Sequence, residues 1–309
     1  MTARAAARAI FDAALAAGDV RPLVLAALGQ LEPRQGGRLL VVGAGKASGA
    51  MASAVEAALG DGVTGGVVAV KDGHTATTRR VWLREAGHPV PDERGAAAAR
   101  EILAVANGAE AGDLVLALIS GGASALTPAP APPVTLGDKQ AVTGLLLAAG
   151  ATINELNAVR KHLSLLKGGQ LARAAAPARV HALLLSDVIG DPLDVIGSGP
   201  TAPDASTFAE ALGILDRFAI RERAPAAVRE RLERGQRGEI PETPKAGDPL
   251  FARVTNSIIG NNTLVVDAAA AQAAELGFAP HVLTRALQGE ARAVAGQLVE
   301  LARRIGAGL

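Results

Sequence analysis

Short apolar runs alternate with longer amphipathic stretches along most of this chain, and this alternation constrains the fold more than any other feature. The apolar runs predict strands at Leu39–Val42, Val67–Val70, Leu114–Ile119, Val180–Leu185, Ser257–Ile259 and Pro280–Leu283. The longer stretches predict helices at Thr2–Ala17, Ala47–Leu59, Glu93–Ala106, Leu136–Ala148, Thr207–Phe218, Thr263–Leu276 and Glu290–Ile305. Such alternation indicates βαβ units, and fully apolar runs are typical of strands buried on both faces. We therefore expect an α/β fold, a Rossmann-like doubly wound and mainly parallel sheet with helices on both faces. Thr127–Val134 and Arg221–Asp248 are interpreted as long loops.

Composition excludes several classes of protein. The chain has 309 residues, 31 basic and 30 acidic side chains, and only 2% aromatic residues, which argues against a dedicated nucleic-acid binder. No apolar run reaches the ~18–20 residues that a membrane span needs. The absence of cysteine excludes disulfides, thiolate zinc sites and cysteine nucleophiles. We expect a cytoplasmic protein that acts on a small molecule, with no nucleic-acid or membrane partner, and we leave a homodimer open.

A glycine-rich turn follows the first predicted strand. In Val41-Val42-Gly43-Ala44-Gly45-Lys46-Ala47-Ser48-Gly49, the glycines permit a tight turn, and the helix that follows presents free N–H groups to an anion. Lys46 would add a positive charge at this point. The segment is not a Walker loop, and Ser48 replaces the third glycine of a dinucleotide fingerprint. An ordinary turn with an exposed lysine is the alternative.

A second loop of small residues, Ser120-Gly121-Gly122-Ala123-Ser124, follows the predicted strand Leu114–Ile119. Backbone amides of such a loop can surround a phosphate, and Ser120 and Ser124 add hydroxyl donors. Two such loops at the edge of the sheet where α/β proteins bind ligands favour a binding site over two plain turns.

The segment Ile153–Gln170 combines cations and small polar residues and ends in a glycine pair. Helical spacing from Ile153 to about Leu166 would place Asn157, Arg160, Lys161 and Ser164 on one broad face, with Gly168 as a helix cap. Such a face suits phosphate or carboxylate oxygens. A solvated charged surface is the alternative interpretation.

Two aspartates follow the predicted strand Val180–Leu185. Asp187 and Asp191 offer the hard oxygen ligands that Mg²⁺ prefers, although each could instead shape a turn. Ser198, Gly199 and Thr201 could add hydroxyl and amide donors.

Two loop residues are weaker candidates. His88 lies in the rigid turn Gly87–Glu93 and could be catalytic or structural. Asn261 follows the predicted strand Ser257–Ile259 and could bind a ribose or base, or form a plain turn.

The ordered motifs resemble those of a known family. They are Gly-Ala-Gly-Lys-Ala, Gly-His-Pro-Val-Pro-Asp, Ser-Gly-Gly-Ala-Ser-Ala-Leu, Asn-x-x-Arg-Lys-His-Leu-Ser-x-x-Lys-Gly-Gly, and Ser-Asp-Val-x-Gly-Asp with Ser-Gly-Pro-Thr. From about residue 5 onward, the chain resembles the N-terminal domain of the glycerate 2-kinase (MOFRL-type glycerate kinase) family, some members of which are labelled hydroxypyruvate reductase. The resemblance implies ATP- and Mg²⁺-dependent phosphorylation of D-glycerate to 2-phosphoglycerate.

The resemblance also implies a departure from the family pattern. Members usually continue into a smaller C-terminal domain that closes a cleft and supplies catalytic residues, and this sequence stops before it. We expect residues 1–309 to form the Rossmann-like N-terminal domain, with the C-terminal domain absent from this chain.

These observations give a working hypothesis for the site. Lys46, Arg160 and Lys161 are the catalytic candidates, with Lys46 on phosphate oxygens and the other two on the glycerate carboxylate or on developing charge. Asp187 and Asp191 would place Mg²⁺. The candidates for binding ATP are Gly43, Gly45, Ser120, Gly121, Gly122, Ser124, Asn157, Ser198, Gly199 and Asn261.

Two other functions stay open at this point. An NAD(P)H-dependent hydroxypyruvate reductase is favoured by the glycine turn and by Asp72 near the end of the next strand. It is disfavoured by the missing third glycine and by the lack of an evident catalytic histidine–acid pair. A non-catalytic module that binds nucleotides or sugar phosphates is the second alternative.

Overall fold

The computed structural model describes residues 1–31 and 36–306 of the chain. It divides them into two compact units, which we describe separately. One is the continuous segment Gly18–Asn261, and the other combines Met1–Ala17 with Asn262–Leu309. This division does not test the assignment of residues 1–309 to one family domain, which stays a prediction.

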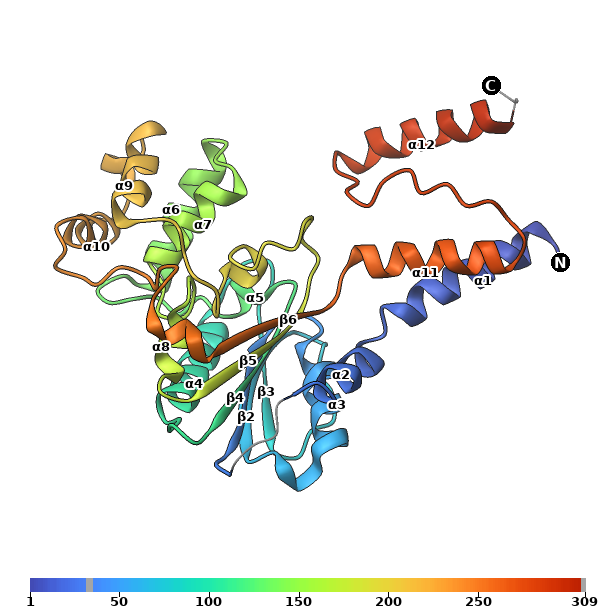
Figure 1. The fold of residues 1–309 in the computed structure, drawn as a ribbon. Coiled ribbons are helices and arrows are strands. Elements are labelled where there is room, and N and C mark those ends of the chain that lie inside the picture. Colours follow the sequence, from blue (N-terminus) through green and yellow to red (C-terminus); the bar gives the residue numbers. More distant parts are fainter. Residues whose placement is uncertain (32–35, 307–309) are drawn as a thin grey trace. The chain divides into compact units, whose positions relative to one another are not determined.

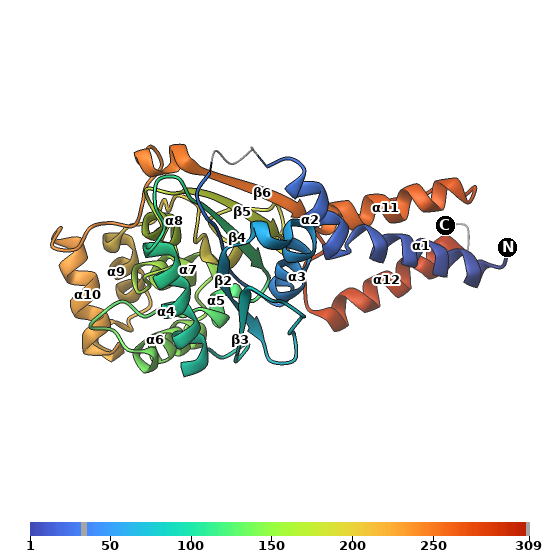
Figure 2. The ribbon, with the colours of Figure 1, turned by 90° about the horizontal axis from the view of Figure 1, so that it is seen from below.

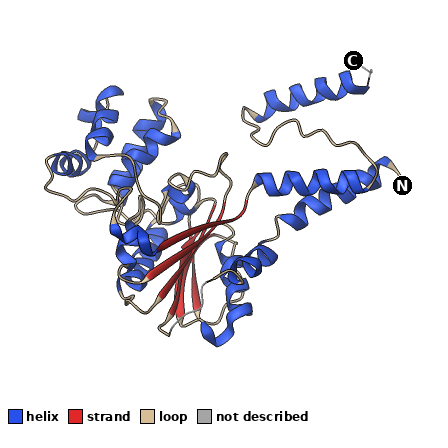
Figure 3. Ribbon diagram, viewed as in Figure 1, coloured by secondary structure: helices blue, strands red, loops and turns tan. Residues whose placement is uncertain are grey.

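A parallel sheet organises the unit Gly18–Asn261 (Figures 1 and 3). Within the described residues it has six strands, in the order β3-β2-β1-β4-β5-β6, and every neighbouring pair is parallel. The strands are β1 (Leu39–Ala44), β2 (Gly65–Lys71), β3 (Val81–Ala86), β4 (Leu114–Ser120), β5 (Arg179–Leu185) and β6 (Val254–Gly260). This is the doubly wound order, in which the direction of winding reverses between β1 and β4. The predicted fold class is confirmed.

Helices cover both faces of this sheet. The unit contains α2 (Val20–Leu28), α3 (Ser48–Leu59), α4 (Glu93–Asn107), α5 (Ala123–Leu126), α6 (Leu136–Ala148), α7 (Ile153–His162), α8 (Gln170–Ala175), α9 (Phe208–Arg217) and α10 (Ala226–Gln236). Short 3-10 turns are η1 (Gly60–Gly62), η2 (Ile196–Ser198), η3 (Arg221–Arg223) and η4 (Pro249–Arg253). Figures 1 and 2 show α2 and α3 on one side of the sheet and α4 and α8 on the other, and the buried cores of the two faces contain side chains from these same helices. A third core lies among α6, α7, α9 and α10.

One strand was missed and one was wrongly predicted. The missed strand β3 lies at the edge of the sheet, where Trp82 and Glu85 are exposed, so its sequence is not an apolar run. The predicted strand Pro280–Leu283 is wrong, because this segment has neither helical nor strand structure. Val282 and Leu283 are 37% and 62% exposed, so apolar character here does not reflect burial in a sheet.

Helix boundaries in the two polar segments also differ from the predictions. The segment Arg221–Asp248 is not one loop, because it contains α10, which buries Val228 and Leu232 at a helical spacing. Helix α7 ends at His162 rather than near Leu166, and its C-cap is Leu163. Gly168 is therefore not a cap of this helix. Helices α2, α5 and α8 were not predicted either.

The second unit is helical. It contains α1 (Ala3–Ala17), α11 (Asn262–Glu275) and α12 (Ala291–Gly306), and α1 packs against α11. These confirm the three helices predicted at the ends of the chain. Among the helices of the described residues, none combines the length and the apolar character needed to cross a membrane.

Candidate active site

The loops that follow β1 and β4 are tied together at the point where the winding of the sheet reverses. The amide of Lys46 donates to the carbonyl of Gly121 at 2.9 Å, and the amide of Ala47 donates to Ser120 Oγ at 3.0 Å. Ser120 Oγ also lies 3.0 Å from Ser48 Oγ. Both hydroxyls are buried, so Ser120 and Ser48 join the two loops. A contact between Ser120 and a nucleotide stays a prediction.

Two glycines lie where these loops approach their neighbours most closely. Gly45 has a φ of +145°, and a Cβ atom there would lie 2.0 Å from Ser120 Oγ. A Cβ atom on Gly121 would lie 2.2 Å from Asp187 Oδ2. A side chain at position 45 would therefore collide with the backbone of Ser120, whereas a side chain at position 121 would displace the exposed carboxylate of Asp187.

Side chains from three strand ends, those of β1, β3 and β5, gather around Gly121 and Gly122 at the end of β4. A Cβ atom placed on Gly122 would lie 3.1 Å from His88 Nε2 and 3.4 Å from Lys46 Cγ, while Asp187 borders the adjacent Gly121. Lys46 and Asp187 are exposed, and neither side chain has a hydrogen bond or ion pair with any residue that the structure describes. The predicted residues Lys46, Gly121, Gly122 and Asp187 are thus brought together.

His88 also belongs to this group, although the sequence marked it only as a weak candidate. Burial lowers the pKa of the His88 imidazole, and the charges of Lys46 and Lys71 lower it further. The ring is therefore neutral near pH 7 and can accept a hydrogen bond or a proton. The sequence signal for its position was the rigid turn that follows β3, a strand that the apolar pattern did not detect.

The predicted polar residues Ser124, Ser198 and Asn157 form a chain of hydrogen bonds. Ser124 Oγ lies 3.0 Å from Ser198 Oγ, and Ser198 Oγ donates to Asn157 Oδ1 at 3.1 Å. Ser198 adopts a φ of +64° and is followed by Gly199 with a φ of +61°. This chain links the loop after β4 to helix α7.

The cationic segment is largely buried, so its interpretation as a solvated surface is wrong. Asn157, Lys161, His162 and Lys167 are each at most 4% exposed. Lys167 Nζ donates to the carbonyls of Ser124 and Thr127 at 2.8 and 3.2 Å. These two hydrogen bonds fix the backbone of the segment after β4. Burial, reinforced by the charge of Arg160, lowers the pKa of Lys167 to about 7.

Arg160 and Lys161 differ in whether nearby carboxylates compensate their positive charge. Lys161 Nζ lies 3.1 Å from Asp204 Oδ1 and 3.3 Å from Asp194 Oδ2, so two carboxylates compensate its charge. Burial raises the pKa of Asp204, but Lys161 and the hydrogen bonds to this carboxylate outweigh that effect, and the net pKa is lowered. Arg160 is half-buried, and no acceptor or carboxylate within the described ranges pairs with its guanidinium. Burial lowers the pKa of Arg160.

The two predicted metal ligands lie on one loop. Asp191 adopts a φ of +53° and accepts a hydrogen bond from Asn261 Nδ2 at 2.5 Å, which connects this loop to the end of β6. Asp187 lies beside Gly121. Residues 1–31 and 36–306 contain no group of three or more histidine, aspartate or glutamate residues arranged to hold a metal. One or two carboxylates together with phosphate oxygens suffice for Mg²⁺, so the Asp187 carboxylate beside the loop after β4 has the chemistry that such an ion requires.

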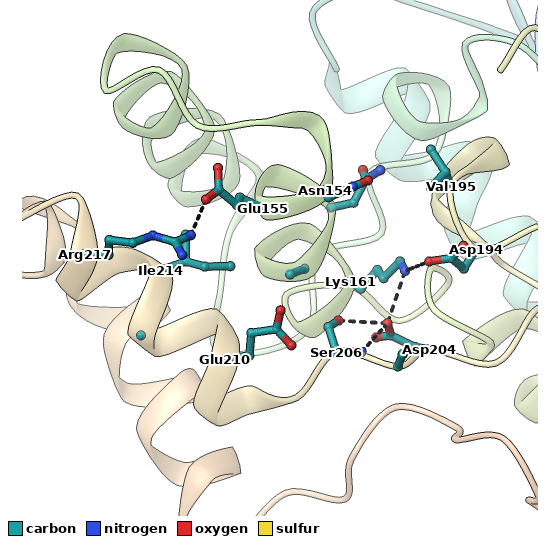
Figure 4. Close-up of a pocket in the computed structure, with 14 residues that line it drawn as sticks. Asn154, Glu155, Lys161, Asp194, Val195, Asp204, Ser206, Glu210, Ile214 and Arg217 are labelled. Atoms are coloured by element: carbon teal, nitrogen blue, oxygen red, sulfur yellow. Dashed lines mark hydrogen bonds and ion pairs between the residues drawn. The ribbon is translucent and has the colours of Figure 1, made fainter. Parts of the chain in front are cut away.

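A cavity of about 540 Å³ opens between α7 and α9 (Figure 4). Its lining includes Asn154, Asn157, Lys161, Asp194, Glu210 and Arg217. Only Asn157 and Lys161 of these were predicted as site residues. Asn154 lies at the start of α7, within the predicted cationic segment, but was not singled out. Glu210 and Arg217 come from α9 and Asp194 from the chain after β5, where the sequence analysis named no site residue at these positions.

The fold and this edge of the sheet define a doubly wound α/β protein in which two glycine-rich loops, a lysine and an aspartate meet at the switch point of the sheet. Comparison with known protein families then shows to which family the chain belongs. A family model described as a domain of unknown function, DUF4147, matches residues 6–233, and the chain belongs to this family.

Named relatives confirm the resemblance to glycerate 2-kinases. A glycerate 2-kinase from Pyrococcus horikoshii is 43% identical over 256 residues, covering 83% of this chain and 57% of that protein. A putative hydroxypyruvate reductase from Agrobacterium vitis is 46% identical over 292 residues, covering 94% of this chain and 64% of that protein. The crystal structure of a glycerate kinase from Thermotoga maritima superimposes with a TM-score of 0.85 at 37% identity, covering 97% of this chain and 69% of that one. The chain thus spans about three fifths of the length of the two sequence relatives.

Proposed function

We propose that this protein transfers the γ-phosphoryl group of ATP to the 2-hydroxyl of D-glycerate, giving 2-phosphoglycerate, with Mg²⁺ as the metal. The observation that carries the proposal is the meeting of the Lys46 side chain, the Gly121–Gly122 backbone and the Asp187 carboxylate where the winding of the sheet reverses. Ligands of doubly wound proteins bind at this point. The names of the glycerate kinase relatives support the choice of substrate.

We assign roles in phosphoryl transfer to the charged side chains that other residues of the described structure do not already compensate. Phosphoryl transfer depends mainly on positioning and on stabilisation of charge. Lys46, with no partner in the described structure, would hold phosphate oxygens beside the amides of Gly121 and Gly122. Arg160 would attract the glycerate carboxylate or developing charge, whereas Lys161 is already compensated by two carboxylates. Asp187 and Asp191 would hold Mg²⁺, which supplies positive charge at the phosphate oxygens when bound.

Several contacts disfavour the reductase alternative. Asp72, the candidate for a ribose contact, forms an ion pair with Arg94 at 2.6 Å, and the hydrogen bond from Arg94 lowers the pKa of Asp72. Ser48 stands at the position of the third glycine and is buried against Ser120. Because one relative is named a putative hydroxypyruvate reductase, NADH still needs to be tested directly.

The proposal extends to location and partners. The nearly balanced charge argues against a nucleic-acid partner. We further propose that the protein acts on a small molecule in the cytoplasm, without a membrane partner. A homodimer remains open and can be tested by sedimentation.

The first experiment is a calorimetric titration of the 309-residue chain with Mg·ATP and, separately, with NADH. We expect saturable binding of Mg·ATP and none of NADH. Binding of NADH alone would overturn the kinase proposal and favour a dinucleotide site at Gly43–Gly45.

Substitution of Lys46 tests its role in the reaction. We expect Lys46→Ala to lower kcat for glycerate phosphorylation by roughly 10²–10³-fold, because a positioned cation at the transferring group is lost. The melting temperature should be unchanged, since the side chain is exposed and unpaired in the described structure. Arg100→Ala removes an exposed cation on α4 and controls for a general loss of positive charge. A Lys46→Ala variant with near wild-type kcat would remove Lys46 from the mechanism.

A further inference from the structure

The cavity between α7 and α9 is much larger than glycerate requires. Its volume of about 540 Å³ lies within the ~300–1,000 Å³ range of typical small-molecule sites. A three-carbon acid would fill only a small part of it. The size is suited to a nucleoside or to another ligand of similar dimensions.

The charge of the lining excludes an anionic occupant. Four carboxylates line the cavity, those of Glu155, Asp194, Asp204 and Glu210, against the two cations Lys161 and Arg217. Arg217 forms an ion pair with Glu155, and Lys161 pairs with both Asp194 and Asp204, as Figure 4 shows. The remaining excess of negative charge repels a triphosphate or a hydroxy acid. It favours an uncharged ligand that carries hydroxyl or amino groups.

Unused hydrogen-bonding groups line the same cavity. Asn157 is only 4% exposed, and its Oδ1 accepts from Ser198, but its Nδ2 has no acceptor in the parts of the chain that the structure describes. Among the described residues, Asn157 Nδ2 is not one of the buried side-chain atoms that lack a partner, so it is accessible to solvent. A ligand acceptor can take the place of water there. Near the mouth, the carboxylate of Glu210 and the amide of Asn154 are also unpaired within the described residues. The site therefore offers a donor in its floor and an acceptor at its rim.

The cavity is connected to the candidate phosphate loop. Asn157 in its floor binds Ser198, and Ser198 lies 3.0 Å from Ser124, two residues after Gly122. Two hydrogen bonds thus separate the floor of the cavity from the loop after β4. The free cations Arg160 and Lys46 lie outside the lining.

We propose that this cavity holds the adenosine part of the phosphate donor, while the phosphates lie outside it, at the loops after β1 and β4. Ribose hydroxyls or the base amino group donate to Asp194 and Glu210, and an oxygen or ring nitrogen accepts from Asn157. A carboxylate that accepts from a ribose hydroxyl has the same role in dinucleotide-binding sheets. The assignment rests on the proposed kinase function and adds to it the position of the nucleoside.

A substitution that fills the cavity tests the assignment. Gly213 lines the cavity from α9, and a Cβ atom built there meets no atom within 4 Å. Gly213→Met should therefore fit the helix while occupying the cavity. Gly144→Met on α6 is the matched control, because Gly144 is also exposed and helical with open space around it, but lies outside the lining. Circular dichroism melts of both variants verify that the fold is intact.

The expected result depends on whether the ligand contains a nucleoside. Calorimetry should show that Gly213→Met raises the Kd of both Mg·ATP and adenosine by about tenfold or more, a loss of about 1.4 kcal/mol. The Kd of Mg·tripolyphosphate, which has no nucleoside, should not change. The control variant should bind all three ligands like the wild type.

Other outcomes would overturn the assignment in distinguishable ways. Unchanged binding of Mg·ATP by Gly213→Met would exclude the nucleoside from this cavity and leave the kinase proposal intact. Loss of D-glycerate binding with unchanged Mg·ATP binding would assign the cavity to the acid instead. A wild-type chain that binds no Mg·ATP would contradict both the nucleoside site and the kinase proposal.

Discussion

Buried lysines are the most informative residues of this protein. Lys139, Lys161 and Lys167 are each at most 7% exposed, but only Lys161 pairs with carboxylates within the described structure. Lys139 Nζ donates to the carbonyl of Pro128, and Lys167 Nζ donates to Ser124 and Thr127. These two ammonium groups therefore hold the segment after β4 through carbonyl oxygens, which compensate a positive charge only in part.

The lowered pKa of Lys167 predicts a pH dependence of stability. This pKa is about 7 in the folded protein, against about 10.4 for an unperturbed lysine. Between these values the unfolded chain binds more protons, so the free energy of unfolding should rise with pH from about 7 to about 10, by about 1 kcal/mol per unit. Lys167→Met should flatten this rise, although Lys139, whose pKa burial also lowers, will preserve part of it.

Urea denaturation at several pH values between 7 and 10 measures this effect. The comparison is between the slopes of the free energy of unfolding against pH in the wild type and in Lys167→Met. Lys71→Met, at a less buried lysine, provides the control. An equally steep rise in wild type and Lys167→Met would show that Lys167 does not titrate in this range.

At the scale of elements, the close approach of β1 and β4 sets the geometry of the site. Gly43 on β1 is in register with Leu118 on β4, and a Cβ atom on Gly43 would lie 2.2 Å from the Leu118 carbonyl oxygen. The two strands carry the loops that hold Lys46 and Gly121. Any widening between them would therefore also move the candidate phosphate site.

Gly43→Ala tests this dependence. We expect the free energy of unfolding to fall by about 1–3 kcal/mol, because the added methyl group has no space between the strands. Gly144→Ala on α6 is the control and should stabilise the protein by up to about 1 kcal/mol, since alanine favours the helix. Chemical denaturation of both variants provides the measurement. A Gly43→Ala variant as stable as the wild type would show that β1 and β4 can move apart without lowering the free energy of unfolding.

At the scale of the whole molecule, the candidate site and the main cores belong to one unit. The buried residues of the three hydrophobic cores all lie between residues 20 and 259. In the part of the second unit that the structure describes, only Ala6 and Ala273 are buried hydrophobic residues. The second unit therefore contributes little to the cores that hold the site.

A fragment of residues 18–261 tests this division. We expect it to fold cooperatively and to bind Mg·ATP with a Kd within about threefold of the full chain, since all the proposed contacts are retained. Circular dichroism melts and calorimetry of the fragment and the full chain provide the comparison. A fragment that is folded but has lost Mg·ATP affinity would show that the helices of the second unit contribute to the site.

The sequence alone was sufficient to predict a strand or a turn where that structure depends on residues close together in the chain. The apolar runs identified five strands, because strands buried between two helical layers have few polar residues. Gly45 and Gly121 marked the loops that follow β1 and β4, because a left-handed backbone or a close approach requires glycine. The edge strand β3 was missed, because a strand exposed on one side shows no such run.

Only the tertiary structure decided which of the polar residues are available to a ligand. Arg160 and Lys161 are adjacent in the sequence, but Lys161 meets Asp194 and Asp204, which lie 33 and 43 residues further along the chain. His88 reaches Gly122 only because parallel strands end at one edge of the sheet. The cavity between α7 and α9 arises from the packing of two helices. The physical reason is that charge compensation and shape depend on distances through space, which local sequence patterns do not contain.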